Sequence, residues 1–221
     1  MRQALAVLGL ALALAGCGES ARGHGTATLW VTRDNGAHVI FSGTVPAGEN
    51  GIRAVERELK ITTRYGGRYL QSVNGFEGSL AQQRDWFYYL NGVDGDRSAA
   101  ELTLRVGDIL WWDFRRWTGS TMHVPVVLGA YPEPFLRGFP GITSVVSSDR
   151  ALAKRIALQV HGAVNAKKPP RNYVVIGGSL APDTARIRPF RKGVLLELGR
   201  AVAQKLAADP TALRYRYGFE Q

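Results

Sequence analysis

Residues 85–93 read DWFYYLNGV and residues 104–112 read LRVGDILWW, and these two stretches predict the central strands and turns of the first half of the chain. Runs of aromatic and β-branched residues that end at Gly, Asn or Asp are typical of strands joined by tight turns. The Asn-Gly pair accepts the positive φ that a hairpin needs. The predicted elements are a strand over Asp85–Leu90, a hairpin at Asn91-Gly92, a strand over Glu101–Val106, a turn at Gly107-Asp108 and a strand over Ile109–Trp117.

The last of these strands has two different sides, because successive side chains of a strand point to opposite faces of a sheet. One side is purely apolar and is expected to face a helix, and it consists of Leu110, Trp112 and Phe114. The other side mixes an aromatic ring with charges, as an open sheet face would, and it consists of Trp111, Asp113 and Arg115.

The aromatic strand adds large rings to both faces. Trp86 and Tyr88 point to one face, and Phe87 and Tyr89 point to the other. A single short helix covers only one face of a sheet. The remaining aromatic face must therefore meet either the second half of the chain or a ligand.

The rest of the first half supplies that helix and more strands. Ile52, Val55 and Leu59 share one helical face, and Asn50 is a suitable N-cap. The expected elements are strands over Ala27–Thr32 and Val39–Thr44, a helix over Ile52–Leu59 and a strand over Tyr69–Phe76 that is broken at Asn74-Gly75. One helix on a mixed sheet is an α+β unit.

The order of these motifs resembles a known family. An aromatic strand with Asn-Gly, then a hydrophobic strand with Gly-Asp and a Trp-containing strand, is similar to β-grasp domains related to the C-terminal domain of transcobalamin and intrinsic factor. Residues 69–75 resemble the strand that precedes them, and the resemblance covers residues 26–117. The resemblance implies a β-grasp fold and a corrinoid or similar macrocycle as the class of ligand. Many bacterial members of this family are secreted and have no known function. In transcobalamin a large helical barrel holds the other side of the corrin. The present sequence predicts no such barrel, so the second half would have to form that wall.

The second half has a different composition. All five tryptophans lie between Trp30 and Trp117, and Val, Ala, Leu and Arg dominate after Gly119. The domains expected are therefore residues 26–118 and residues 119–221, the second a small α/β sandwich without a recognised family. Its predicted elements are strands over Val124–Leu128, Ile142–Val146 and Tyr173–Ile176, a helix capped by Asp149 that runs to His161, a helix over Gly193–Ala208 and a strand over Leu213–Phe219.

Cys17 is the only cysteine, and it follows the small residues Ala15 and Gly16. The uncharged run from Ala4 to Ala15 is shorter than the about 20 apolar residues that cross a bilayer, which favours a signal peptide. The segment resembles the bacterial lipoprotein box, which implies cleavage after residue 16, acylation of Cys17 (palmitate among the acyl groups) and a tether over residues 17–25. The expected location is the outer face of a cell membrane, at a bacterial surface or in a periplasm. An ordinary signal peptide with an incidental cysteine is the alternative.

The chain carries 28 Lys and Arg against 18 Asp and Glu, a net charge of +10. An extracytoplasmic basic protein is attracted to anionic lipid head groups or anionic wall polymers, whereas nucleic acid is not an expected partner in that compartment. A solvated basic surface without any partner is the alternative. Lys167-Lys168 and the bases of residues 186–192 contribute to this surface.

Catalytic and metal-binding patterns are weak. The four histidines, at positions 24, 38, 123 and 161, have no metal-ligand spacing, and His123 alone lies beside a candidate groove. Asp94-Gly95-Asp96 lacks the rest of a calcium loop, and Gly177-Gly178-Ser179 lacks a directly following helix for an anion site. We therefore expect no enzyme, no metal and no cofactor.

The aromatic residues form the best candidate site. The predicted ligand-binding residues are Trp86, Tyr88, Asn91, Trp111 and Trp117. The leading hypothesis is a lipid-anchored, non-catalytic protein that binds a flat or macrocyclic small molecule on an aromatic sheet face. The alternatives are packing of these rings in the core or between domains, and a structural or adhesion module whose aromatic face binds a partner protein or a wall glycan.

Overall fold

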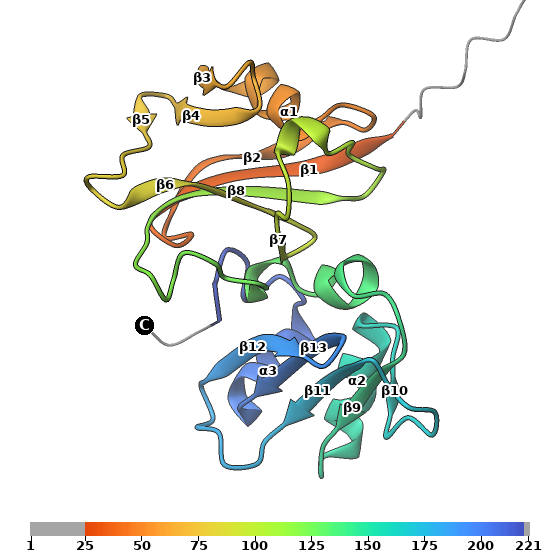
Figure 1. Cartoon of the computed structure of the whole chain (residues 1–221). Helices are drawn as coiled ribbons and strands as arrows, with labels where there is room; N and C mark the ends of the chain where they lie inside the picture. The colour runs from red at the N-terminus through yellow and green to blue at the C-terminus, as the bar shows by residue number, and fades with distance from the viewer. Residues whose placement is uncertain (1–24, 219–221) are drawn as a thin grey trace, which may run out of the picture.

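The computed structural model describes residues 25–218, which form two units arranged one above the other (Figure 1). The predicted signal peptide and Cys17 lie outside the described residues. Within residues 25–218 no helix is both long and apolar enough to cross a membrane.

The first unit is built on a five-stranded mixed sheet. Its strands, in order across the sheet, are β2 (His38–Pro46), β1 (Thr26–Arg33), β8 (Ile109–Arg116), β6 (Arg84–Leu90) and β7 (Val93–Asp94). β1 and β8 run parallel, and the other pairs are antiparallel. A helix and a small sheet pack on one face of it: α1 (Gly51–Glu58), β3 (Ile61–Arg64), β4 (Tyr69–Val73) and β5 (Phe76–Glu77).

Helix α1 forms where the apolar spacing and the cap predict it. The Asn50 side chain accepts hydrogen bonds from the backbone N–H groups of Ile52, at 3.1 Å, and Arg53, at 2.9 Å. These bonds satisfy two of the N–H groups that a helix start leaves free. Ile52 and Val55 are buried in the same cluster as Leu110, so the apolar side of β8 does face the helix, as expected.

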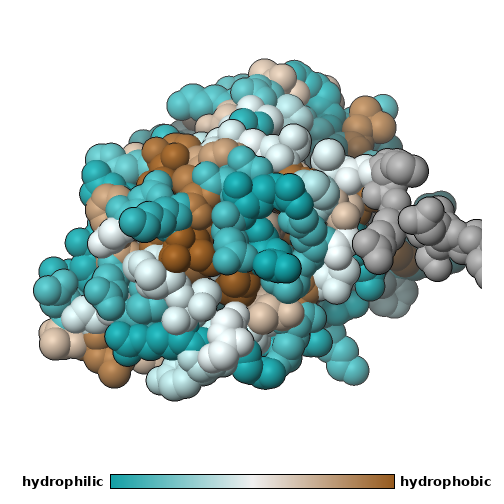
Figure 2. All heavy atoms as spheres, turned by 90° about the horizontal axis from the view of Figure 1, so that it is seen from above, coloured by the Kyte–Doolittle hydropathy of each residue, from teal (hydrophilic) through white to brown (hydrophobic). Residues whose placement is uncertain are grey.

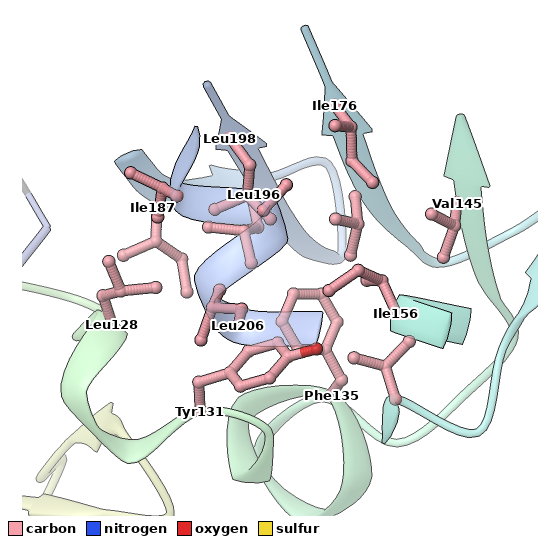
Figure 3. Close-up of a cluster of buried hydrophobic side chains, with 14 of the residues drawn as sticks. Leu128, Tyr131, Phe135, Val145, Ile156, Ile176, Ile187, Leu196, Leu198 and Leu206 are labelled. Atoms are coloured by element: carbon pink, nitrogen blue, oxygen red, sulfur yellow. The ribbon is translucent and has the colours of Figure 1, made fainter. Parts of the chain in front are cut away.

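The second unit is a five-stranded sheet with two helices on one face. Its strands, in order, are β10 (Ala163–Val164), β9 (Thr143–Val146), β11 (Asn172–Ile176), β13 (Gly193–Leu198) and β12 (Ala185–Phe190), of which only β12 is antiparallel to its neighbour. The helices are α2 (Arg150–Gln159) and α3 (Arg200–Ala208). Ile156 and Leu206 from these helices pack on Val145 and Leu196 of the sheet (Figure 3). The predicted α+β fold class is confirmed.

Two of the predicted strands are wrong, because their residues make isolated bridges and single hydrogen bonds instead of a continuous strand ladder. Residues 102–106, expected as a strand, follow a short helical turn at Ala99–Glu101 and bond to the loop before α1, where the Leu104 N–H donates to the Glu49 carbonyl. Val124–Leu128 makes one isolated bridge, between Val126 and Val93, and then turns into a short helical segment.

Two further predictions fail at the C-terminal end. Gly193–Ala208 is a strand followed by a helix, broken at Gly199, because an apolar run such as Val194–Leu196 fits a buried strand as well as a helix. A side chain at Gly199 would lie 2.0 Å from the Ala181 carbonyl oxygen. The described part of Leu213–Phe219 is not a strand, since Tyr215 has φ +66° and bends the chain. Strands β3, β7, β10 and β12 were not predicted.

Candidate functional site

The aromatic face of the first sheet that α1 leaves uncovered packs against the second half of the chain. Trp30, Tyr89 and Trp111 form one buried cluster with Val127 and Tyr217, and Trp111 is 0% exposed. The Trp111 ring centroid lies 5.7 Å from that of Tyr89 and 5.4 Å from that of Tyr217. The expectation of an open face here is therefore corrected: this face is the junction between the two units.

Asp113 is the polar centre of this junction. Its carboxylate accepts hydrogen bonds from the hydroxyls of Thr32, at 2.6 Å, and Tyr217, at 2.8 Å, and from the backbone N–H groups of Asn35 and Gly36, both at 3.1 Å. Burial raises the pKa of Asp113, and these hydrogen bonds oppose that shift. Tyr217 thereby ties the C-terminal segment to the first sheet.

Arg115 is buried beside it. Its guanidinium carbon lies 3.7 Å from the centre of the Phe87 ring, and its nitrogens donate to the carbonyls of Thr121 and Met122 at 2.7 and 3.0 Å. Both charged residues were expected on an open surface. Asp113 instead binds the C-terminal segment, and Arg115 binds the segment that connects the two units.

A cavity of about 190 Å³ lies on the opposite face of the sheet. Tyr88 and Trp112 form part of its wall, with ring centroids 5.1 Å apart and planes tilted by 42°. Its other walls and rim come from Arg68, Tyr69, Leu70, Trp86, Phe87, Asp94, Gly95, Arg97, Ser98, Ala99 and His123. Seen from above, the first unit shows apolar surface bordered by hydrophilic residues (Figure 2).

The indole groups of the first sheet differ in their hydrogen bonds. The Trp86 Nε1 donates to the Phe76 carbonyl at 2.9 Å, and the Trp111 Nε1 donates to the Thr32 hydroxyl at 2.7 Å. The Nε1 of Trp112 is buried and finds no acceptor among residues 25–218, although Trp112 is only 4% exposed. A buried donor without an acceptor costs about 1–3 kcal/mol. Trp112 therefore combines a position in the wall of an aromatic cavity with a buried indole N–H that has no acceptor in the described part of the chain.

Polar groups lie at the rim of this cavity. The Nδ1 of His123 is 3.4 Å from a carboxylate oxygen of Asp94. Burial raises the pKa of Asp94, and the hydrogen bond and charge of His123 act in the opposite direction. Tyr88 donates its hydroxyl to the Arg97 carbonyl at 2.7 Å, and burial raises its pKa. The rim thus combines a hydrogen-bond acceptor, Asp94, with the cations Arg68 and Arg97.

Replacing His123 with alanine is expected to raise the pKa of Asp94, because the change removes the group that lowers it. The carboxyl titration is measured by carbon-detected NMR in the wild type and the variant. Arg116→Ala, which removes a cation that does not line the cavity, is the control and is expected to leave the Asp94 titration unchanged. An unchanged or lower Asp94 pKa in His123→Ala would contradict the pairing of these two residues.

A groove of about 820 Å³ adjoins the cavity and shares Tyr88, Asp94, Gly95 and Arg97 with it. Asn91 lines this groove, but its side chain is engaged within the protein. It donates to Asp108 at 2.9 Å and accepts from the Ile109 N–H at 2.8 Å. Asn91 also has φ +52°, as the predicted hairpin requires. Its contacts stabilise the hairpin that forms the floor of the groove.

The structure brings only part of the predicted site together. Trp86 and Tyr88 line the cavity, and Asn91 lines the adjoining groove. Trp111 lies on the opposite face, and Trp117 lies beyond the end of β8, where its backbone N–H donates to the Gln83 carbonyl. Trp112 was assigned to the core alone. Its position directly across from Tyr88 in the strand pair is the signal that could have identified it.

Among residues 25–218, no three His, Cys, Asp or Glu side chains are grouped to hold a metal ion.

The matches to known proteins described below each cover less than half of this chain. The search of curated proteins finds no match. A solved structure of haptocorrin in complex with Cbi is 16% identical over 47% of this chain, with a TM-score of 0.37, and this chain covers 28% of it. A putative metal binding protein from Ruminococcus gnavus ATCC 29149 is 16% identical over 43% of this chain and 100% of its own, with a TM-score of 0.35. Residues 52–116, from α1 to the end of β8, match the model of a domain of unknown function (DUF4430).

Proposed function

We propose that this protein is a non-catalytic, extracytoplasmic binding protein that holds a small flat ligand in the cavity whose wall includes Tyr88 and Trp112. The supporting observation is the unpaired indole N–H of Trp112 in the wall of an aromatic cavity. Aromatic walls favour flat, conjugated ligands, and a buried donor favours a ligand with an acceptor atom at its edge. Asp94 at the rim favours a ligand that also carries an N–H or O–H group.

The size of the cavity limits the ligand. Pockets that enclose a drug-sized molecule have about 300–1,000 Å³, whereas this cavity has about 190 Å³ and holds one small ring system. A corrinoid or another macrocycle is too large to be enclosed. It would insert a planar substituent into the cavity and lie along the adjoining groove of about 820 Å³.

The proposed location follows from the sequence. Residues 1–16 act as a lipoprotein signal peptide, acylated Cys17 anchors the chain in the outer face of a membrane, and residues 17–25 form the tether. The ligand domain comprises residues 26–118. Residues 119–221 form a second domain that covers the other aromatic face through Tyr217.

A structural or adhesion module is the second candidate. Tyr65 and Leu80 are 77% and 79% exposed on the first unit, where a partner protein or a wall glycan would contact them. Loss of a pulled-down complex in a Tyr65→Ser and Leu80→Ser double variant would favour this function over ligand capture.

The test is a titration of residues 20–221 with cobalamin, cobinamide, haem, wall oligosaccharides and small nitrogen heterocycles. Tryptophan fluorescence, corrected for ligand absorbance, and calorimetry report binding. We expect saturable binding that Tyr88→Ala weakens at least about tenfold, because the stacking wall is lost. Trp112→Phe keeps the ring but removes the N–H, and it is expected to weaken binding about 2- to 10-fold.

Trp117→Phe is the matched control, since Trp117 lies outside the cavity. Its affinity is expected to equal that of the wild type. Absence of binding by every ligand class, or equal losses in Tyr88→Ala and Trp117→Phe, would contradict the capture function.

A further inference from the structure

The basic charge of this protein is concentrated in its second half. Residues 26–118 contain eleven Lys and Arg and eleven Asp and Glu, so the first unit is neutral. Residues 119–221 contain fifteen Lys and Arg against six Asp and Glu. A charge difference of this size between two halves indicates that one of them meets an anionic partner.

Part of this charge gathers around an aromatic ring on the outer face of the second sheet. Arg188 and Arg191 place their guanidinium carbons 5.7 and 5.3 Å from the centre of the Phe190 ring. Ile187 is buried in the core that the helices cover. Its neighbour Arg188, which pairs with Leu195 across the strands, therefore points to the face of the sheet opposite these helices. Glu197, 3.6 Å from Arg188, is the acidic partner at this position.

Contacts continue from this cluster to the point where the described chain begins. Arg171 donates to the carbonyls of Lys192, at 2.6 Å, and Pro140, at 3.0 Å. Arg137, three residues before Pro140, donates to the Val106 carbonyl at 3.0 Å. The neighbouring Gly107 N–H bonds to the Thr26 carbonyl at 2.8 Å, at the start of β1.

The start of β1 and the cluster are therefore joined by a series of contacts that passes through Arg137 and Arg171. We define the basic edge by its exposed cations and the apolar side chains beside them: Arg105, Val106, Arg171, Arg188, Phe190, Arg191 and Lys192. Arg137 links the two units, and its charge is balanced by Glu133 at 3.0 Å and Asp108 at 3.7 Å.

We propose that the basic edge lies on an anionic phospholipid bilayer. Exposed arginines and lysine beside a phenyl ring and a valine suit the boundary between head groups and acyl chains. The orientation rests on the proposed anchor at Cys17. Gly25 lies eight residues after Cys17, and this segment spans at most about 28 Å when extended, which keeps the start of β1 and the edge beside it close to the membrane.

The test uses residues 18–221 without acylation, so that charge alone must provide binding. Co-sedimentation is measured with phosphatidylcholine vesicles and with vesicles that are roughly one third phosphatidylglycerol. We expect binding to the anionic vesicles only, at low ionic strength. It should disappear at about 1 M salt, where the Debye length is about 3 Å.

The decisive comparison is between two triple variants that remove the same charge. Arg188→Gln, Arg191→Gln and Lys192→Gln together are expected to lower vesicle binding at least tenfold. Arg150→Gln, Lys154→Gln and Lys205→Gln change exposed cations of the two helices, on the other face of the second sheet, and are expected to lower it less than threefold.

Equal losses in the two triple variants would overturn the proposal, as would absence of binding to anionic vesicles. Binding to a soluble polyglycerol phosphate but not to vesicles would also overturn it, in favour of a wall polymer. Tyr88→Ala should bind vesicles like the wild type, because Tyr88 is not part of the basic edge. Loss of ligand binding and loss of vesicle binding can therefore be told apart.

Discussion

Trp111→Ala is expected to lower the free energy of unfolding by about 3–5 kcal/mol, the range for truncating a large buried aromatic side chain. Trp111 is 0% exposed and lies between the rings of Trp30, Tyr89 and Tyr217, with its Nε1 bonded to Thr32. Alanine would leave a cavity at the junction of the two units and would remove the indole N–H that donates to the Thr32 hydroxyl. Urea denaturation followed by circular dichroism measures the change.

Trp117→Ala is the matched control, because Trp117 is half-buried beyond the end of β8. Its expected cost is about 1 kcal/mol, the centre of the range for ordinary substitutions. If Trp111→Ala cost no more than Trp117→Ala, the aromatic junction would not contribute to stability.

Asp113→Ala is the second change with a large expected effect. It would leave the backbone N–H groups of Asn35 and Gly36 and the hydroxyls of Thr32 and Tyr217 without their acceptor. Each buried group left unsatisfied costs about 1–3 kcal/mol, and partial access of water reduces the sum, so we expect about 3–4 kcal/mol. We also expect faster tryptic cleavage after Arg214 and Arg216, because the segment that carries Tyr217 loses its tie to the first sheet.

Tyr217→Phe removes one hydroxyl and keeps the ring. We expect a cost of about 1 kcal/mol, with the Asp113 carboxylate still held by its remaining donors. Unfolding and proteolysis are measured in the same way for both variants. Equal stability of Asp113→Ala and Tyr217→Phe would show that the carboxylate does not organise the junction.

Local patterns predicted the elements that depend on neighbouring residues. The N-cap Asn50, the alternation of β8 and the hairpin at Asn91-Gly92 all act within a few residues, and all have the predicted form. The prediction failed where apolar periodicity fits two structures, as in Gly193–Ala208. It also failed at Leu213–Phe219, where alternation reflects contacts with the first unit rather than a strand.

In the candidate site, too, local patterns predicted some residues, and contacts between distant parts of the chain decided the others. The sequence identified Trp86 and Tyr88 as neighbours on one face of an aromatic strand, and both line the cavity. It could not show that Trp112 keeps an unpaired N–H, since that depends on atoms from distant strands and loops. It also could not exclude Trp111 from the ligand-binding residues, because the covering residues come from positions 124–130 and 217.

Strand alternation and helix capping are local, so the α+β class, the aromatic strands and the assignment of one face of β8 to helix α1 could be predicted from the residues alone. What covers the other aromatic face depends on long-range contacts. Both a ligand and a second domain satisfy the need to bury apolar rings, and the hydrophobic effect does not distinguish between them. The position of Tyr217 beside Asp113 and Trp111 made that face a junction and left the cavity beside Trp112 as the candidate ligand site.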